Sequence, residues 1–154
     1  MPKIDVAAVP ERKGTGYPPQ FNAPCAKRVR QRLGNAGGLT DVGINLMHLP
    51  PGNWSSQRHW HSAEDEFVYV LEGEVVLVTD AGEEVLRSGD SAGFKAGVRD
   101  GHHLQNRSLR EAVLLEVGSR KTADDEGEYP DIDMRFLKDD AGYVHMDGTP
   151  YPNK

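Results

Sequence analysis

The sequence has few cysteines, few helix-like windows and no long apolar run. Cys25 is the only cysteine, so no internal disulfide can form and no thiolate cluster is available for a zinc-finger or iron–sulfur site. Any metal site must therefore use nitrogen and oxygen ligands. No apolar stretch approaches the roughly 20 residues that span a bilayer, so we expect a soluble chain with no membrane partner.

Excess positive charge is also lacking. The net charge is −6, whereas a surface that binds a phosphate backbone is built from clustered Lys and Arg, so we expect no nucleic-acid partner. The N-terminus, residues 1–5, has no basic stretch followed by an apolar run of the kind that marks a secretory signal. These features predict a cytoplasmic protein.

Turn-forming residues are abundant. Seventeen glycines and ten prolines punctuate 154 residues, and few windows repeat apolar residues at helical spacing, so the sequence predicts an all-β chain. The length suits one ordinary domain. Five of the ten prolines fall within residues 1–24, which favours an extended N-terminal arm.

Short alternating runs begin near Leu39. Residues 39–49 alternate as a half-buried strand should, with apolar side chains and His48 on one parity. Residues 66–71 and 74–79 form a hairpin pattern, and further β-rich runs cover 83–87, 91–94, 102–106 and 112–117. The segment 121–128 is polar and acidic, as expected of a solvated loop, and 132–137 and 143–145 are candidate edge strands. Turns about every ten residues are typical of a sandwich or closed barrel.

The histidines supply the strongest chemical signal. His59 and His61 are two residues apart, so in a strand both side chains point to the same face. Glu66 follows five residues later, and a second histidine pair, His102 and His103, lies in a later strand. Glycines at 52 and 73 bracket the first group.

This spacing resembles the first motif of the cupin superfamily: a glycine, two histidines one residue apart, a glutamate and a closing glycine. Residues 89–106 resemble the second motif. The resemblance implies a small double-stranded β-helix, or jelly-roll, barrel over residues 31–120, preceded by an arm (1–30) and followed by a C-terminal extension (121–154). It also implies metal ligation by His59, His61, Glu66 and His102.

The second motif departs from the family pattern. Lys95 occupies the usual proline position, and two extra residues separate Gly97 from His102. Strand parity favours His102, which shares a face with Leu104, while His103 stays open as the alternative ligand. Three imidazoles and one carboxylate suit one divalent transition metal ion, namely Mn, Fe, Ni, Co or Zn.

Other residues are candidates for binding a small-molecule substrate. His48 could line the cavity, and Arg58 and Lys95 lie in loops that enter the site strands, where a cation could hold a phosphate or carboxylate. No catalytic base is assigned, although Glu66, His48 and His103 are candidates.

The function remains open between three classes. The sequence resembles bacterial single-domain cupins described by analogy as sugar-phosphate isomerases, which implies a metal-dependent enzyme on a small polar or anionic metabolite. An iron(II)-dependent dioxygenase and a non-catalytic small-molecule-binding cupin are the alternatives. Exposed sheet edges and the arm together favour a homodimer.

Overall fold

The computed structural model describes residues 2–152, and its regular secondary structure consists almost entirely of strands. The strands are β1 (Glu11–Lys13), β2 (Val29–Arg32), β3 (Val42–Leu49), β4 (Trp60–His61), β5 (Glu66–Glu72), β6 (Glu74–Thr79), β7 (Gly82–Arg87), β8 (Ser91–Phe94), β9 (His103–Gln105), β10 (Ala112–Ser119), β11 (Gly127–Tyr129), β12 (Met134–Phe136) and β13 (Tyr143–Val144). One helical turn, α1 (Leu33–Ala36), and short 3₁₀ turns at Val6–Ala8, Pro19–Phe21, Ala23–Cys25 and Lys138–Asp140 complete it. The all-β class predicted from the sequence is confirmed.

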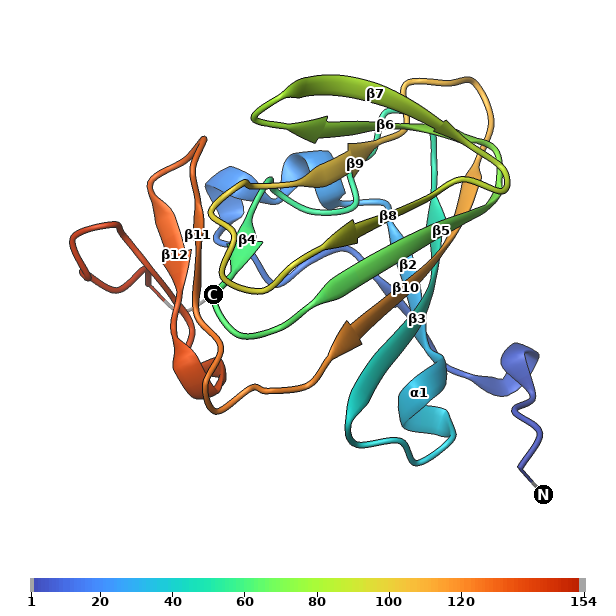
Figure 1. The fold of residues 1–154 in the computed structure, drawn as a ribbon, viewed down its shortest axis with the longest axis horizontal. Helices are drawn as coiled ribbons and strands as arrows, with labels where there is room; N and C mark the ends of the chain where they lie inside the picture. Colours follow the sequence, from blue (N-terminus) through green and yellow to red (C-terminus); the bar gives the residue numbers. More distant parts are fainter. Residues whose placement is uncertain (1, 153–154) are drawn as a thin grey trace.

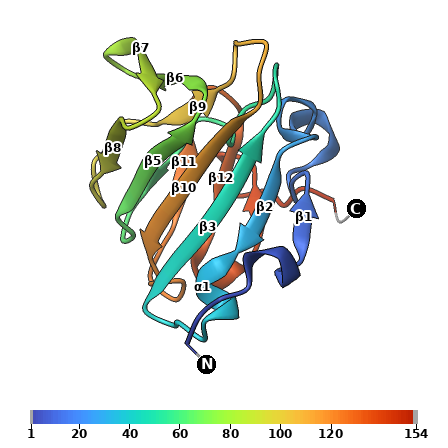
Figure 2. The same ribbon diagram turned by 90° about the vertical axis from the view of Figure 1, so that its right-hand side faces the viewer.

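The strands form three antiparallel sheets. A six-stranded sheet has the order β1-β2-β3-β10-β5-β8, a four-stranded sheet the order β13-β12-β11-β4, and a three-stranded sheet the order β7-β6-β9. Both smaller sheets lie on the inner side of the six-stranded sheet (Figure 1 and Figure 2). The backbone ladders therefore describe a sandwich-like barrel and not one continuous closed ring.

Strand alternation decides which side chains enter the interior. In β5, Val68 and Val70 are buried whereas Phe67 and Tyr69 on the other parity are exposed. A cluster of buried residues fills the space between β3, β5 and β10 on one side and β6, β7 and β9 on the other: Met47, Leu49, Val68, Val70, Val75, Leu77, Leu86, Leu104, Ala112 and Leu114. This core leaves the other end of the interior to polar groups.

The chain ends build a second cluster beyond that core. Tyr17 and Cys25 from the N-terminal region pack with Tyr129, Met134 and Tyr151 from the C-terminal region. The N-terminal region also supplies β1 and β2 to the six-stranded sheet, and β2 pairs directly with β3. Residues 121–128 differ from the solvated loop expected, because Asp125 is buried and Gly127 begins β11. No helix within residues 2–152 is long and apolar enough to cross a membrane.

Candidate metal centre

Three segments bring the predicted ligands together. Glu66 begins β5 and has the inward parity of Val68, while His61 lies in β4. His59 and His102 form an isolated antiparallel bridge, which joins the segments leading into β4 and β9. The site therefore lies where the two smaller sheets meet, opposite the start of β5.

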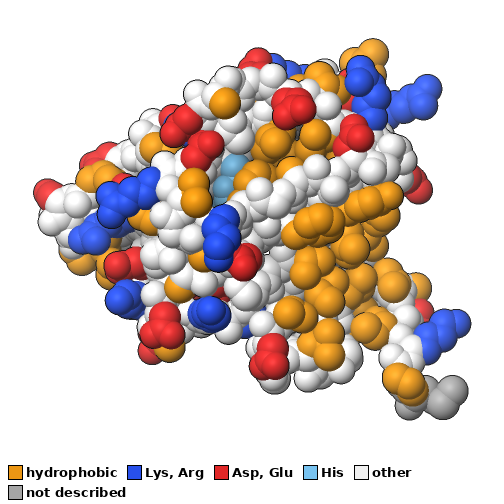
Figure 3. Space-filling model, in the orientation of Figure 1, with side chains coloured by type: hydrophobic (Ala, Val, Ile, Leu, Met, Phe, Trp, Pro, Cys, Tyr) orange, Lys and Arg blue, Asp and Glu red, His pale blue; other side chains and the backbone are white. Residues whose placement is uncertain are grey.

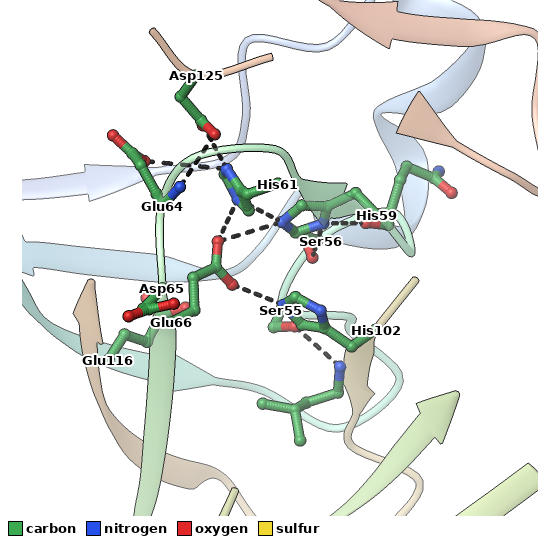
Figure 4. Close-up of polar contacts among 12 residues, drawn as sticks. Ser55, Ser56, His59, His61, Glu64, Asp65, Glu66, His102, Glu116 and Asp125 are labelled. Carbon is green, nitrogen blue, oxygen red and sulfur yellow. Dashed lines mark hydrogen bonds and ion pairs between the residues drawn. The ribbon is translucent and has the colours of Figure 1, made fainter. Parts of the chain in front are cut away.

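The four side chains face one another (Figure 4). The Nε2 atoms of His59 and His61 are 3.1 Å apart, and His59 Nε2 lies 3.5 Å from Oε1 of Glu66. His61 Nε2 contacts the same oxygen, and His102 Nε2 lies 2.6 Å from Glu66 Oε2. One carboxylate thus touches three imidazoles.

Hydrogen bonds on the outer side of the rings decide which nitrogens face inward as lone pairs. His59 Nδ1 lies 2.8 Å from the Gln57 carbonyl oxygen, which can only accept, so Nδ1 donates. His61 Nδ1 lies 2.6 Å from Oδ2 of Asp125 and donates in the same way. His102 Nδ1 is buried without a hydrogen-bond partner among the described residues, and its ring is held by stacking on Phe94 at 3.6 Å between centroids.

This arrangement fits a cation. Two inward lone pairs and the Glu66 carboxylate oxygen lie within hydrogen-bonding range of one another, and such a cluster of acceptors repels itself unless a proton or metal ion sits between them. His59, His61 and Glu66 each offer one ligand atom in a group that spans less than 4.8 Å. Nitrogen and carboxylate donors of this kind suit borderline divalent ions.

The electrostatics of the cluster agree with that geometry. Burial alone would raise the pKa of Glu66, but hydrogen bonds from His102, His59 and His61 hold it well below its usual range. Burial alone would lower the pKa of His61, but its hydrogen bonds to Asp125 and Glu66 raise that pKa to about 10. Without a metal ion, His61 therefore carries the proton that balances the carboxylates.

Asp125 was not predicted from the sequence. Its carboxylate accepts hydrogen bonds from the backbone amides of Ala63, at 2.9 Å, and Glu64, at 3.2 Å, as well as from His61. These donors hold the pKa of Asp125 below its usual range although burial would raise it. Aspartate in an acidic segment carries no local pattern that marks it as a partner of a histidine 64 residues away.

The structure separates the two candidates of the second histidine pair. His102 turns towards Glu66, whereas His103 Nδ1 lies 2.8 Å from the Ser56 carbonyl and its ring packs edge-on against Trp54. His103 is buried, with only 4% of it exposed. Trp54, which forms an isolated antiparallel bridge with Gln105, packs against this ring.

The remaining substrate candidates lie apart from the histidine cluster. Arg58 forms ion pairs with Asp131 at 2.8 Å and Asp80 at 2.6 Å, and His48 faces the outer side of β3, 3.4 Å from Glu111. Neither lines the large cavity that contains the cluster. Lys95 lines a smaller cavity of about 230 Å³ that also reaches His61 and His102, but its side chain is 75% exposed and pairs with Asp65.

The large cavity has a volume of about 810 Å³, within the range of roughly 300–1,000 Å³ typical of ligand pockets. Besides His59, His61, Glu66 and His102 it is lined by Glu64, Glu116, three tyrosines and four arginines. In the space-filling view, histidine atoms are visible at the bottom of a hollow in the surface (Figure 3). His59, His61 and Glu66 are each partly exposed and line this cavity, so the candidate metal centre is accessible from outside.

Comparison with known proteins agrees with the motifs. Residues 45–118 match the family model for a cupin domain. The sugar phosphate isomerase from a cupin superfamily of Silicibacter pomeroyi is 41% identical, with a TM-score of 0.91 over 98% of this chain and 97% of that one. This chain belongs to the cupin superfamily.

Two further solved structures match with lower identity. An Acidithiobacillus ferrooxidans protein assigned provisionally as a sugar phosphate isomerase is 30% identical, with a TM-score of 0.73 over 84% of this chain and 83% of that one. A predicted oxalate decarboxylase of Thermotoga maritima, 19% identical over 76% of this chain and 97% of that one with a TM-score of 0.62, shares the fold alone. No curated protein matches the chain.

Proposed function

We propose that this cupin is a metal-dependent isomerase that acts on a sugar phosphate. The observation that carries the proposal is the convergence of three imidazoles on the Glu66 carboxylate inside a ligand-sized cavity. The names of two relatives, 41% and 30% identical, support the choice of reaction. His59, His61, Glu66 and His102 would hold one divalent ion of the Mn, Fe, Ni, Co or Zn group.

A bound ion would polarise the adjacent carbonyl and hydroxyl oxygens of an aldose or ketose, which acidifies the hydrogen between them. The protein must then supply a base that moves this proton. Of the three candidates predicted from the sequence, His48 and His103 do not line the large cavity. Glu66 does, but both of its oxygens face histidines.

Glu64 is the better candidate for the base. It lines both cavities beside His61, and burial raises the pKa of its carboxyl towards the range in which a carboxylate can exchange protons. Oε2 of Glu64 accepts a hydrogen bond of 2.8 Å from the backbone amide of Lys121, which fixes the position of the carboxylate. We assign proton transfer to Glu64 and metal ligation to Glu66.

The two glutamates separate the roles experimentally. Glu64→Gln should keep its metal ion and lose about 10²–10⁴-fold in kcat, since general acid–base catalysis contributes that much. Glu66→Gln and the His59→Ala/His61→Ala double variant should lose the metal ion. Elemental analysis of protein purified without a histidine tag, together with an assay of aldose–ketose conversion of pentose and hexose phosphates, measures both.

The same experiments can reject the proposal. Undiminished metal in the double histidine variant would overturn the ligand assignment. Oxygen uptake in the presence of iron(II), without isomerisation, would instead indicate the dioxygenase alternative, for which this donor set is also suited. Tight retention of a small molecule without any turnover would indicate a non-catalytic binder.

A further inference from the structure

A row of arginines enters the large cavity from β2. Arg28, Arg30 and Arg32 are spaced by two residues, so strand geometry directs all three to the same face. All three line the cavity that contains the histidine cluster, and Arg120, which follows β10, joins them. The cavity is therefore cationic along one wall, although the chain as a whole is acidic.

A short segment connects this row to the metal centre. The Ser55 carbonyl accepts hydrogen bonds from Arg28 Nη1 and, at 3.3 Å, from Arg30 Nη2. The next residue, Ser56, places its hydroxyl 3.3 Å from His59 Nδ1, as Figure 4 shows. The arginines and His59 thus contact two consecutive residues of one segment, Ser55 and Ser56.

The protein compensates only part of this positive charge. Arg30 pairs with Glu116 through Nε, at 2.8 Å, and Nη2, at 3.2 Å. Arg28 is only 7% exposed and donates to the carbonyls of Gly14 and Ser55, but within residues 2–152 it forms no ion pair. Arg32 is exposed, and its side chain forms neither a hydrogen bond nor an ion pair with any of residues 2–152.

An anion in the cavity would relieve this imbalance. Burial, and then the neighbouring charge of Arg30, lower the pKa of Arg28, while burial, Arg12 and Arg120 lower that of Arg32. Asp140, which also lines the cavity, acts in the opposite direction on Arg32. Of the carboxylates that line the cavity, Glu116 and Asp140 face the arginines, whereas Glu64, Glu66 and Asp125 contact His61.

We propose that Arg28, Arg30 and Arg32 form the subsite that binds the phosphate group of the substrate. Guanidinium groups offer planar, paired N–H donors that match phosphate oxygens. The subsite shares the cavity with the metal centre, so one ligand can present its phosphate to the arginines and its sugar oxygens to the ion. For the sugar end of the substrate, this inference rests on the proposed function. The three arginines take the substrate-binding role that the sequence pattern assigns to Arg58 and Lys95.

Binding of inorganic phosphate to the metal-loaded chain tests the subsite by isothermal titration calorimetry. Arg32→Gln and Arg28→Lys should each weaken phosphate binding by about tenfold. The first variant loses one charge-assisted contact, and the second keeps the charge but loses the paired N–H donors of the guanidinium group. Arg107→Gln is the matched control, since Arg107 is exposed and pairs with Glu83 outside the cavity. Arg32 is exposed, so its variant tests binding without a risk to folding.

A second comparison separates this inference from the proposed function. Ribose 5-phosphate should lose the same tenfold in the arginine variants, while ribose, which lacks the phosphate, should bind them as it binds the parent chain. The metal-free His59→Ala/His61→Ala variant should still bind inorganic phosphate through the arginines. Phosphate binding that ignores Arg28 and Arg32, or that disappears with the ion, overturns the subsite and leaves the isomerase proposal standing. Arginine-dependent binding in a chain that isomerises no sugar phosphate rejects the isomerase and keeps the subsite.

Discussion

His61 illustrates how a buried carboxylate orients an imidazole at the candidate metal centre. Asp125 accepts the hydrogen bond of Nδ1, so Nε2 is the nitrogen that faces Glu66. The backbone amides of Ala63 and Glu64 hold Asp125 in turn. Partners of this kind orient a ligand and increase its basicity.

Asp125→Asn should therefore weaken metal binding by about 10–100-fold without abolishing it, because the histidine loses its charged partner but keeps its position in β4. Competition with a chelator of known affinity measures the change. Asp124→Asn, in the exposed neighbouring residue, is the control and should bind as the parent does. Equal affinity in Asp125→Asn and the parent would remove Asp125 from the metal centre.

His103 shows the opposite use of a buried imidazole. Its Nδ1 donates to the Ser56 carbonyl, and its Nε2 accepts from the Gln105 amide at 3.0 Å. Arg107 donates to the Gln105 oxygen, which turns the amide nitrogen towards His103. These contacts require the neutral ring, and burial lowers the pKa of His103 from 6.5 to about 4.

A lowered pKa makes stability depend on pH. Between pH 6.5 and 4 the unfolded chain binds a proton at His103 that the folded chain rejects, so this contribution is present above pH 6.5 and is lost as the pH falls. The full loss is about 3 kcal/mol. Urea unfolding at pH 7 and pH 4.5 should show a smaller decline for His103→Gln than for the parent, and parallel declines would contradict the assignment.

At the scale of elements, the pairing of β11 with β4 determines where His61 lies. Gly127 pairs with His61 in this ladder and with Phe136 of β12 on its other side. A Cβ added to Gly127 would overlap the Trp60 carbonyl oxygen and the Phe136 ring. The close approach of these strands therefore requires glycine at this position.

Gly127→Ala should lower the free energy of unfolding by about 1–3 kcal/mol, as overpacking does elsewhere, and should also weaken metal binding, because β4 must shift. Gly93→Ala in β8 is the matched control, since its added methyl meets no atom within 4 Å. Urea unfolding and the chelator assay measure the two effects. A Gly127→Ala variant as stable as Gly93→Ala would show that the strands can separate without cost.

At the scale of the whole molecule, the outer face of the six-stranded sheet is apolar. Figure 3 shows hydrophobic side chains gathered over β3, β10 and β5. Phe67, Tyr69 and Leu71 are 41, 37 and 40% exposed, and Leu115 and Val117 lie opposite Tyr69 and Phe67 in the sheet. Exposed apolar surface of this kind is typical of contact sites between proteins.

The homodimer predicted from the sequence stays a prediction, and this face is its candidate contact. Light scattering should give about twice the chain mass of 17.0 kDa for the parent and the single-chain mass for Phe67→Glu, because a buried charge at the centre of an interface is costly. Leu109→Glu, at a residue that is 97% exposed in a loop, should leave the mass unchanged. A parent chain of 17 kDa at micromolar concentration would refute the homodimer.

Several strands were predictable because their signal is local. The two-residue alternation of 66–71 and 74–79 and the turn between them suffice to predict β5 and β6. β2 was missed although its arginines alternate, because charged residues on the inward face do not resemble the apolar pattern of a strand. β4 and β11 are two and three residues long, which is too short for any periodicity.

The sequence by itself determined the all-β class and the common direction of His59 and His61, since residues two apart along a strand point to the same face. Only the tertiary structure decided that His102 faces Glu66 while His103 turns away, that Asp125 supports His61, and that Arg28, Arg30 and Arg32 line the cavity in place of Arg58. Those contacts join residues far apart in the chain. Their partners depend on how separate sheets pack, and spacing along the sequence carries no information about that packing.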